Sequence, residues 1–238
     1  MPSPSDCGIL TVNSDMGEIY MGIKAVIWDL DGTLLDTLDD LTASTNAALA
    51  SCGLPARTKD EVRRFVGSGV RRLMEQAVGE PGAEHPDFDR IMDAFVAHYG
   101  AHSRDKTAPY DGVMEMLHAL SAEGIVHAIV SNKIDSAVKA LSREYFGGLM
   151  HSSVGDDPSR RKKPAPDSVL EAMRLMGVSA QETVYVGDSD VDVITARNAG
   201  IPCIAVTWGF RDEACLRGAG AEHIAHTPQE LMRIAETL

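Results

Sequence analysis

The sequence predicts an α/β protein with a Rossmann-like core of parallel strands and an inserted all-helical cap. Short apolar runs rich in β-branched residues alternate with longer segments of helical spacing, which is the pattern of βαβ units around a parallel sheet. From about residue 38 to residue 104 this alternation stops, and every pattern is helical. A chain of 238 residues is long enough to bury one core together with such an insertion.

The core elements follow one another regularly along the chain. Strands are predicted at residues 24–28, 125–130, 149–153, 183–186 and 203–206, with a weaker one near 221–225. Helices are predicted at residues 113–122, 136–145, 167–176, 190–199, 211–217 and 228–236. The insertion has helical patterns at residues 38–51, 59–66, 70–78 and 88–103. We therefore assign residues 23–36 and 106–238 to the core and residues 37–105 to the cap.

The N-terminal segment and the composition limit the cellular setting. Residues 1–22 resemble neither a secretory nor a transit signal, so we expect a disordered tail, and a natural start at Met21 stays open. No apolar stretch approaches the ~18 residues that a membrane span needs. The net charge of -13 makes nucleic acid and anionic membranes poor partners. Four widely spaced cysteines fit a reducing cytoplasm.

Two carboxylates follow the first predicted strand directly. Asp29 comes after the apolar run 25–28, and Asp31 stands two positions further on. Open α/β sheets bind their ligands at the carboxyl ends of their strands. A turn at Asp31 and Gly32 would explain the second acid. It leaves Asp29 unexplained, because two partly desolvated acids repel each other and need a cation.

A second acidic cluster ends the strand predicted at residues 183–186. If both strands lie in the central sheet, Asp188 can face Asp29 and Asp31, and the three acids form a plausible magnesium site. Hard oxygen ligands without His or Cys favour Mg²⁺ over Zn²⁺. Ser189 or Asp190 can cap the following helix at the same time. Asp192, one turn into that helix, is expected to hold a metal-bound water or a lysine.

Polar residues at two further element ends extend this group. Ser131, followed by Asn132, can donate to a phosphate oxygen, although helix capping explains Ser131 as well. Lys163 precedes the stiff segment 164–166, and its amine can neutralise both a phosphate and the acidic cluster. Lys162 stays open as the alternative, because composition does not separate the two lysines.

Taken in this order, the stretches resemble the haloacid dehalogenase-like hydrolase superfamily. Its signature motifs are matched by Asp29-Leu-Asp31-Gly-Thr33, Ser131, Lys163 and Gly187-Asp188-Ser-Asp-Val-Asp192. The resemblance runs from Lys24 to the C-terminus, and the helical insertion after the first motif looks like the C1 cap. Residues 35–37, 65–70, 131–133 and 207–210 are similar to the phosphoglycolate phosphatase subgroup.

The resemblance implies a role for each matched residue. Asp29 would attack phosphorus and become an aspartyl-phosphate, while Asp31 would transfer the protons. Mg²⁺ would be held by Asp29, by Asp188 and by the backbone carbonyl of Asp31, with Asp192 behind them. The residues implied to contact the phosphate are Thr33, which would also orient Asp31, and Ser131, Asn132 and Lys163.

The cap is expected to close over the site and to set selectivity, with hinges near residues 36–38 and 104–109. Gly67 lets the backbone approach a ligand closely. Arg71 or Arg72 can supply a cation for a substrate carboxylate, although a position on the surface is the better explanation of each arginine.

The implied function is magnesium-dependent hydrolysis of a small phosphate monoester, with 2-phosphoglycolate as the best candidate substrate. The alternatives are a sugar phosphomutase, a pyrophosphatase, a broad sugar or nucleotide phosphatase and, more remotely, a non-catalytic phosphometabolite-binding protein. The expected partner is a small phosphorylated metabolite, and no motif specifies an oligomeric state.

Overall fold

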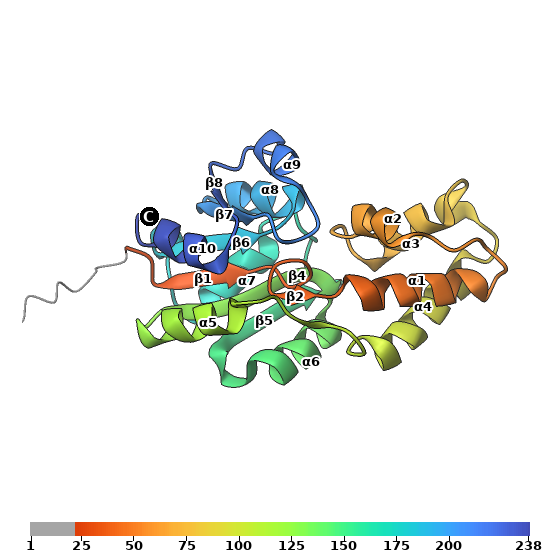
Figure 1. Cartoon of the computed structure of the whole chain (residues 1–238), viewed down its shortest axis with the longest axis horizontal. Coiled ribbons are helices and arrows are strands. Elements are labelled where there is room, and N and C mark those ends of the chain that lie inside the picture. Colours follow the sequence, from red (N-terminus) through yellow and green to blue (C-terminus); the bar gives the residue numbers. More distant parts are fainter. Residues whose placement is uncertain (1–21) are drawn as a thin grey trace, which may run out of the picture.

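A six-stranded sheet forms the core of the protein in the computed structural model, which describes residues 22–238 (Figure 1). The strand order is β5-β4-β1-β6-β7-β8, and every neighbouring pair is parallel. The strands are β1 (Ala25–Trp28), β4 (Val126–Ile134), β5 (Met150–Asp156), β6 (Thr183–Gly187), β7 (Cys203–Val206) and β8 (His223–Ala225). The tail expected at residues 1–22 lies, except for Gly22, outside the described residues.

The register of the central strands brings their carboxyl ends to one edge. Trp28, the last residue of β1, pairs with Ile129 in β4 and with Val186 in β6. All four residues of β1 are buried, as a strand covered on both faces requires. Polar residues that follow these strands therefore lie close together although they are far apart in the sequence.

Helices cover both faces of the sheet. The helices α5 (Val113–Ala122), α6 (Asp135–Phe146) and α10 (Pro228–Ala235) pack on the face that carries Val26 and Trp28. The helices α7 (Asp167–Met176) and α8 (Asp190–Ala199) pack on the face that carries Ile27. The short helix α9 (Glu213–Gly218) packs near β7 and α8 through Leu216. Single 3₁₀ turns occupy Gly82–Glu84, Gly147–Leu149 and Ala180–Glu182.

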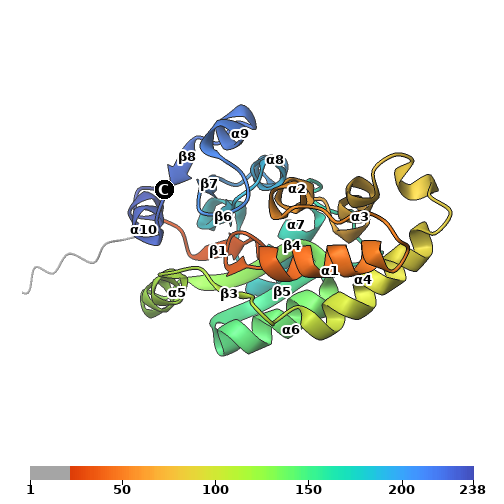
Figure 2. The ribbon, with the colours of Figure 1, turned by 45° about the vertical axis from the view of Figure 1, so that its right-hand side comes forward.

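Four helices form the cap beyond the carboxyl ends of the strands (Figure 1). They are α1 (Leu38–Ala50), α2 (Lys59–Phe65), α3 (Val70–Val78) and α4 (Phe88–His102). Helices α1 and α4 lie side by side (Figure 2), and a hydrophobic cluster of the cap's own residues joins them to α2 and α3. Phe210, from the core loop after β7, also belongs to this cluster.

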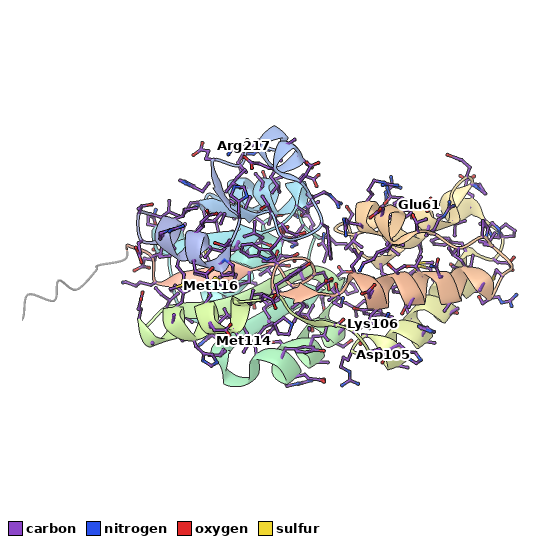
Figure 3. The ribbon with its side chains drawn as sticks, viewed as in Figure 1. Glu61, Asp105, Lys106, Met114, Met116 and Arg217 are labelled. Carbon is purple, nitrogen blue, oxygen red and sulfur yellow. The ribbon has the colours of Figure 1, made fainter. Side chains whose placement is uncertain are left out.

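Two short crossing segments connect cap and core. Strands β2 (Leu35–Asp36) and β3 (Ala108–Pro109) pair antiparallel. Asp40, in the first turn of α1, accepts hydrogen bonds from the backbone of Lys106 and from the backbone and hydroxyl of Thr107. Figure 3 shows Lys106 at the junction of the two parts. The hinge segments expected from the sequence fall at this crossing.

The parallel sheet with helices on both faces confirms the predicted fold class. Four elements differ from the prediction by two or more residues at one end, namely β4, β5, β8 and α9. Strand β4 continues to Ile134 because it keeps pairing with β5 as far as Asp156. Helix α9 starts at Glu213 because the side chain of Asp212 caps it. Of the helices between residues 22 and 238, none combines the length and the hydrophobicity needed to cross a bilayer.

Candidate active site

The acids of the first motif lie in a tight turn at the carboxyl end of β1. The backbone of Asp29 continues the sheet by donating to the carbonyl of Val186 at 2.8 Å. The chain then folds back, because the amides of Leu34 and Leu35 both donate to the carbonyl of Leu30. This turn leaves Asp29 buried and Asp31 partly buried on the side that faces the cap.

Lys163 is the centre of a buried hydrogen-bond network. Its Nζ donates to Oδ1 of Asp29 and to Oδ1 of Asp192, both at 2.7 Å. It also lies 2.9 Å from the hydroxyl of Tyr185 and 3.2 Å from the carbonyl of Val130. An ammonium in such surroundings is fixed in position by its partners. The rival Lys162 instead pairs with Asp156 at 2.7 Å and is half exposed, so the structure places Lys163 at the site.

Asp192 orients this network, and both of its carboxylate oxygens are occupied. Oδ1 accepts from Lys163 and from Tyr185 at 3.0 Å. Oδ2 accepts from the backbone and hydroxyl of Ser189, which closes the capping box at the start of α8. The placement agrees with the expectation that Asp192 holds a lysine.

Asp188 faces Asp29 from the end of β6. Its Oδ1 accepts from the Thr33 hydroxyl at 3.0 Å, and its Oδ2 accepts from the backbone of Phe210 at 2.7 Å. The Thr33 hydroxyl thus orients Asp188, whereas the sequence led us to expect that Thr33 orients Asp31. Two glycines allow the close approach, because a Cβ on Gly32 or on Gly209 would overlap the Asp188 carboxylate.

The buried acids make a favourable place for a cation. Carboxylate oxygens of Asp29, Asp188 and Asp192 lie within 4.8 Å of one another. Burial raises the pKa of Asp29 to about 7, although Lys163 opposes this. Burial and the neighbouring acids Asp192 and Asp29 raise the pKa of Asp188 well above its usual range. A hard divalent cation would relieve this repulsion, and the oxygen donor set fits one.

Asp31 is paired with a lysine for which the sequence suggested no role. The Nζ of Lys133 donates to both carboxylate oxygens of Asp31, at 2.8 Å and 2.9 Å. It also lies 4.6 Å from the centre of the Tyr99 ring, in cap helix α4. The cap therefore touches the expected acid-base residue through Lys133.

Ser131 and Asn132 stand in different relations to the site. Ser131 is buried and lines the cavity beside Asp29. The Asn132 amide donates to the carbonyls of Gly67 and Lys163, and its oxygen accepts from the backbone of Lys163 at 2.8 Å. Asn132 thus links the Lys163 loop to the cap, and its side-chain amide is engaged by protein groups rather than held free for a phosphate.

A cavity between cap and core opens onto Asp29 and Asp31. It has a volume of about 620 Å³, including the part open to solvent. Gly67 lines it, as the sequence led us to expect, but Arg71 and Arg72 do not. Arg71 stacks on Phe88 and pairs with Glu75, and Arg72 pairs with the same acid. Both arginines are more than half exposed, because α3 turns its apolar side to the cavity.

Sequence reasoning missed four residues that act around the site. They are Lys133, Tyr185, Phe210 and Asp40. Tyr185 did carry a signal, because it places a hydroxyl between two valines in the middle of a strand. Phe210 belongs to the stretch 207–210 on which the family resemblance rests, but its contact with Asp188 could not be predicted. Like the contact of Asp40 with Thr107, it joins segments distant in the sequence.

Comparison with known proteins agrees with this site. The model of the family described as haloacid dehalogenase-like hydrolase matches residues 26–206. The chain therefore belongs to the haloacid dehalogenase-like hydrolases. Within that family it is a phosphoric monoester hydrolase, as its phosphatase relatives indicate.

Three of these relatives cover almost the whole chain. A phosphoglycolate phosphatase from Mesorhizobium japonicum is 35% identical over 92% of this chain and 97% of its own length. An N-acetylmuramic acid 6-phosphate phosphatase from Pseudomonas aeruginosa is 32% identical over 91% of this chain and 96% of its own. A solved structure from Lactobacillus delbrueckii subsp. bulgaricus, described as a candidate phosphoglycolate phosphatase, is 33% identical with a TM-score of 0.85, covering 89% and 98% of the two chains.

Proposed function

We propose that this enzyme hydrolyses 2-phosphoglycolate in the cytoplasm, with Mg²⁺ as cofactor and an aspartyl-phosphate at Asp29 as intermediate. The observation that carries the proposal is the buried contact of Lys163 with Asp29, opposite Asp188 at the edge of the sheet. Relatives that carry the name phosphoglycolate phosphatase support the choice of substrate. The free thiols of Cys52, Cys203 and Cys215 fit the proposed compartment.

In this proposal Asp29 and Asp188 hold the metal ion together with the backbone carbonyl of Asp31. When bound, Mg²⁺ supplies positive charge that offsets the buried acids and the charge of the phosphoryl oxygens. The Thr33 hydroxyl and the Phe210 amide keep the Asp188 carboxylate in place for this task. Both of its oxygens retain a lone pair, because each accepts only one of these hydrogen bonds.

The reaction runs in two displacements at phosphorus. An oxygen of Asp29 attacks in line and the ester P–O bond breaks. Asp31 enters this step protonated on one oxygen, with Lys133 kept on the other, and gives that proton to the departing alkoxide. Asp31 then takes a proton from a water molecule, which attacks the aspartyl-phosphate and releases inorganic phosphate. Lys163 and Ser131 stabilise the charge on the transferring phosphoryl group.

The test is the rate of phosphate release with and without Mg²⁺ from a panel of esters. The panel contains 2-phosphoglycolate, N-acetylmuramic acid 6-phosphate, hexose phosphates, a nucleotide and pyrophosphate. We expect Mg²⁺-dependent release with the highest kcat/KM for 2-phosphoglycolate. Asp29→Asn should lower kcat by a factor on the order of 10³ or more, because an amide does not act as the nucleophile.

A matched lysine pair serves as the control. Lys163→Met should lower kcat by about 10² to 10³, as expected for loss of a buried charge that stabilises the transition state. Lys162→Met should have a much smaller effect, because Lys162 pairs with Asp156 outside the cavity lining and approaches the cavity only at the backbone of Gly69. Turnover that survives in Asp29→Asn would exclude the covalent mechanism. A higher kcat/KM for another ester on the panel would identify that ester, in place of 2-phosphoglycolate, as the substrate.

A further inference from the structure

The cap wall of the cavity is apolar. Its side chains come from α1, the segment after α2, α3 and α4, and they are Leu41, Val66, Val70, Leu73 and Phe95. Lys133 is the one cation among the described residues that line the cavity. It belongs to the core, at the end of β4, and its side chain is only 7% exposed.

The ammonium of Lys133 has one N–H group that no carboxylate engages. Two of its three N–H groups serve the two oxygens of Asp31. The remaining side of the ammonium faces the Tyr99 ring, 4.6 Å from the ring centre. An anion that enters the cavity can take this third donor from its weak contact with the ring while the contact with Asp31 persists.

Tyr99 supplies a second donor at the same place. Its hydroxyl is buried and has no hydrogen-bond partner of ordinary geometry among the described residues. Buried hydroxyls are normally partnered, because an unpaired polar group loses its hydration without compensation. Since Tyr99 lines the cavity, a polar group of a ligand could satisfy its hydroxyl.

The position of Lys133 relative to Asp31 limits the length of the ligand. The leaving oxygen of the ester has to come within hydrogen-bond distance of Asp31. The Lys133 ammonium lies 2.8 Å from the same carboxylate, so it is within reach of a group two bonds beyond the leaving oxygen. A carboxylate that one CH₂ group joins to the leaving oxygen lies at this distance of two bonds.

We infer that Lys133 and Tyr99 form the subsite that binds the carboxylate of a short phosphoryloxy-carboxylic acid. The inference rests on the proposed phosphatase function and assigns its substrate selectivity to a lysine of the core and a tyrosine of the cap. The apolar wall of the cap also disfavours sugar phosphates, because the hydroxyl groups of a sugar would lose their hydration against it without gaining hydrogen-bond partners.

The experiment compares two substrates that differ in charge but hardly in shape. The kcat/KM for 2-phosphoglycolate is divided by that for its neutral amide, 2-phosphoglycolamide, with Mg²⁺ present. We expect the wild type to favour the acid by about 10-fold to 100-fold, as a buried charge-assisted hydrogen bond allows. Lys133→Met should reduce the ratio to within about threefold of unity, mainly through KM for the acid.

Three further variants separate selectivity from general damage. Lys133→Arg keeps the charge and should retain more of the preference than Lys133→Met. Tyr99→Phe removes only the hydroxyl and should lower the ratio by about threefold to tenfold. Lys139→Met removes an exposed lysine that pairs with Asp135 in α6, and should leave the ratio unchanged.

The outcomes distinguish this inference from the proposed function. A preference for the acid that persists in Lys133→Met overturns the subsite and leaves the phosphatase function intact. A wild type that hydrolyses acid and amide equally well likewise overturns the subsite alone. No phosphate release from either compound or from p-nitrophenyl phosphate overturns the proposed function, and the subsite falls with it.

Discussion

At the level of single residues, the protein buries ionisable groups in two ways. In the site, Lys163 is balanced by Asp29 and Asp192, and removing one partner leaves the others buried without compensation. Although burial alone would lower the pKa of Lys163, Asp192 and Asp29 raise it well above its ordinary value, so the amine stays charged. His127 shows the opposite solution, since burial lowers its pKa to about 4 and keeps the ring neutral.

His127 should make the stability of the fold depend on pH. Trp28 donates to its Nδ1 at 3.1 Å, so a proton on that nitrogen would break the bond. The unfolded chain takes up this proton near pH 6.5, whereas the pKa of about 4 means that the folded protein takes it up only at lower pH. The contribution of His127 to the free energy of unfolding is therefore fully present above about pH 6.5 and is lost as the pH falls towards 4. We expect this residue to account for a loss of about 2–3 kcal/mol between pH 7 and pH 4.5.

Urea unfolding of the metal-free protein at the two pH values measures this loss. His127→Gln, which can still accept a hydrogen bond from Trp28 but does not titrate, serves as the comparison. The free energy of unfolding should decrease by about 2–3 kcal/mol less in the variant than in the wild type. Equal decreases in both proteins would show that other groups cause the pH dependence.

The residues that could be predicted from the sequence are those that follow a strand directly. Asp29, Asp188 and Ser131 stand at ends of apolar runs, and strand geometry alone brings such positions together. The choice between Lys162 and Lys163 could not be made, because it depends on the course of the loop before α7. The role of Lys133 could not be predicted either, since it depends on the neighbouring Tyr99 in the cap.

At the level of elements, the loop after β7 joins the core to the cap. Arg211 donates to the carbonyls of Arg63, Arg64 and Val66 at the C-terminal end of α2. These carbonyls have no partner within the helix, and a cation at a helix C-terminus also favours the helix dipole. The contact crosses from core to cap, so it stabilises the arrangement of the two parts that the structure shows.

Arg211→Ala should therefore weaken cap closure. We expect kcat/KM for 2-phosphoglycolate to fall by about fivefold to tenfold, chiefly through KM, because partly exposed hydrogen bonds from a cation contribute about 1 kcal/mol. The matched control is Arg217→Ala on α9, which pairs with Glu213 and lies on the outer side of the core away from the cap (Figure 3). Similar losses in both variants would contradict a role of Arg211 in closure.

The helices of the cap could be predicted from their periodicity, but their orientations could not. Val70, Leu73 and Ala77 give α3 an apolar side, and Arg71 and Arg72 occupy the other side. From the sequence alone, either side can be assigned to a ligand. The structure resolves this point, because the apolar side of α3 faces both the cap cluster and the cavity.

At the level of the whole molecule, the protein has a net charge of -13, and three acids are buried together in the site. A cation bound there relieves repulsion in the folded state, whereas the unfolded chain offers no comparable arrangement. Ligands that bind only the folded state stabilise it by mass action. The cap adds a hydrophobic cluster of its own, so the protein has a core on each side of the cavity.

Mg²⁺ should therefore raise the melting temperature. At a concentration of 100 times its dissociation constant, the ion adds about 2.7 kcal/mol, which corresponds to about 5–10 °C for a protein of this size. Thermal unfolding with Mg²⁺ and with EDTA measures the difference. Asp188→Asn should abolish the shift, whereas Glu171→Gln should keep it, because Glu171 is a partly exposed acid that pairs with Arg174. A shift that persists in Asp188→Asn would place the ion elsewhere.

The loop after β7 also constrains how this protein can diverge in evolution. Over three successive residues, Gly209 fits against Gly32 and Asp188, the Phe210 backbone holds Asp188, and Arg211 holds α2. Inserting or deleting one residue there would move all three contacts at once. Changes of length are more easily accommodated in the exposed turn between α3 and α4, which touches neither the acids nor the cavity. New substrate ranges should thus arise by altering the cap wall while the loop after β7 keeps its length.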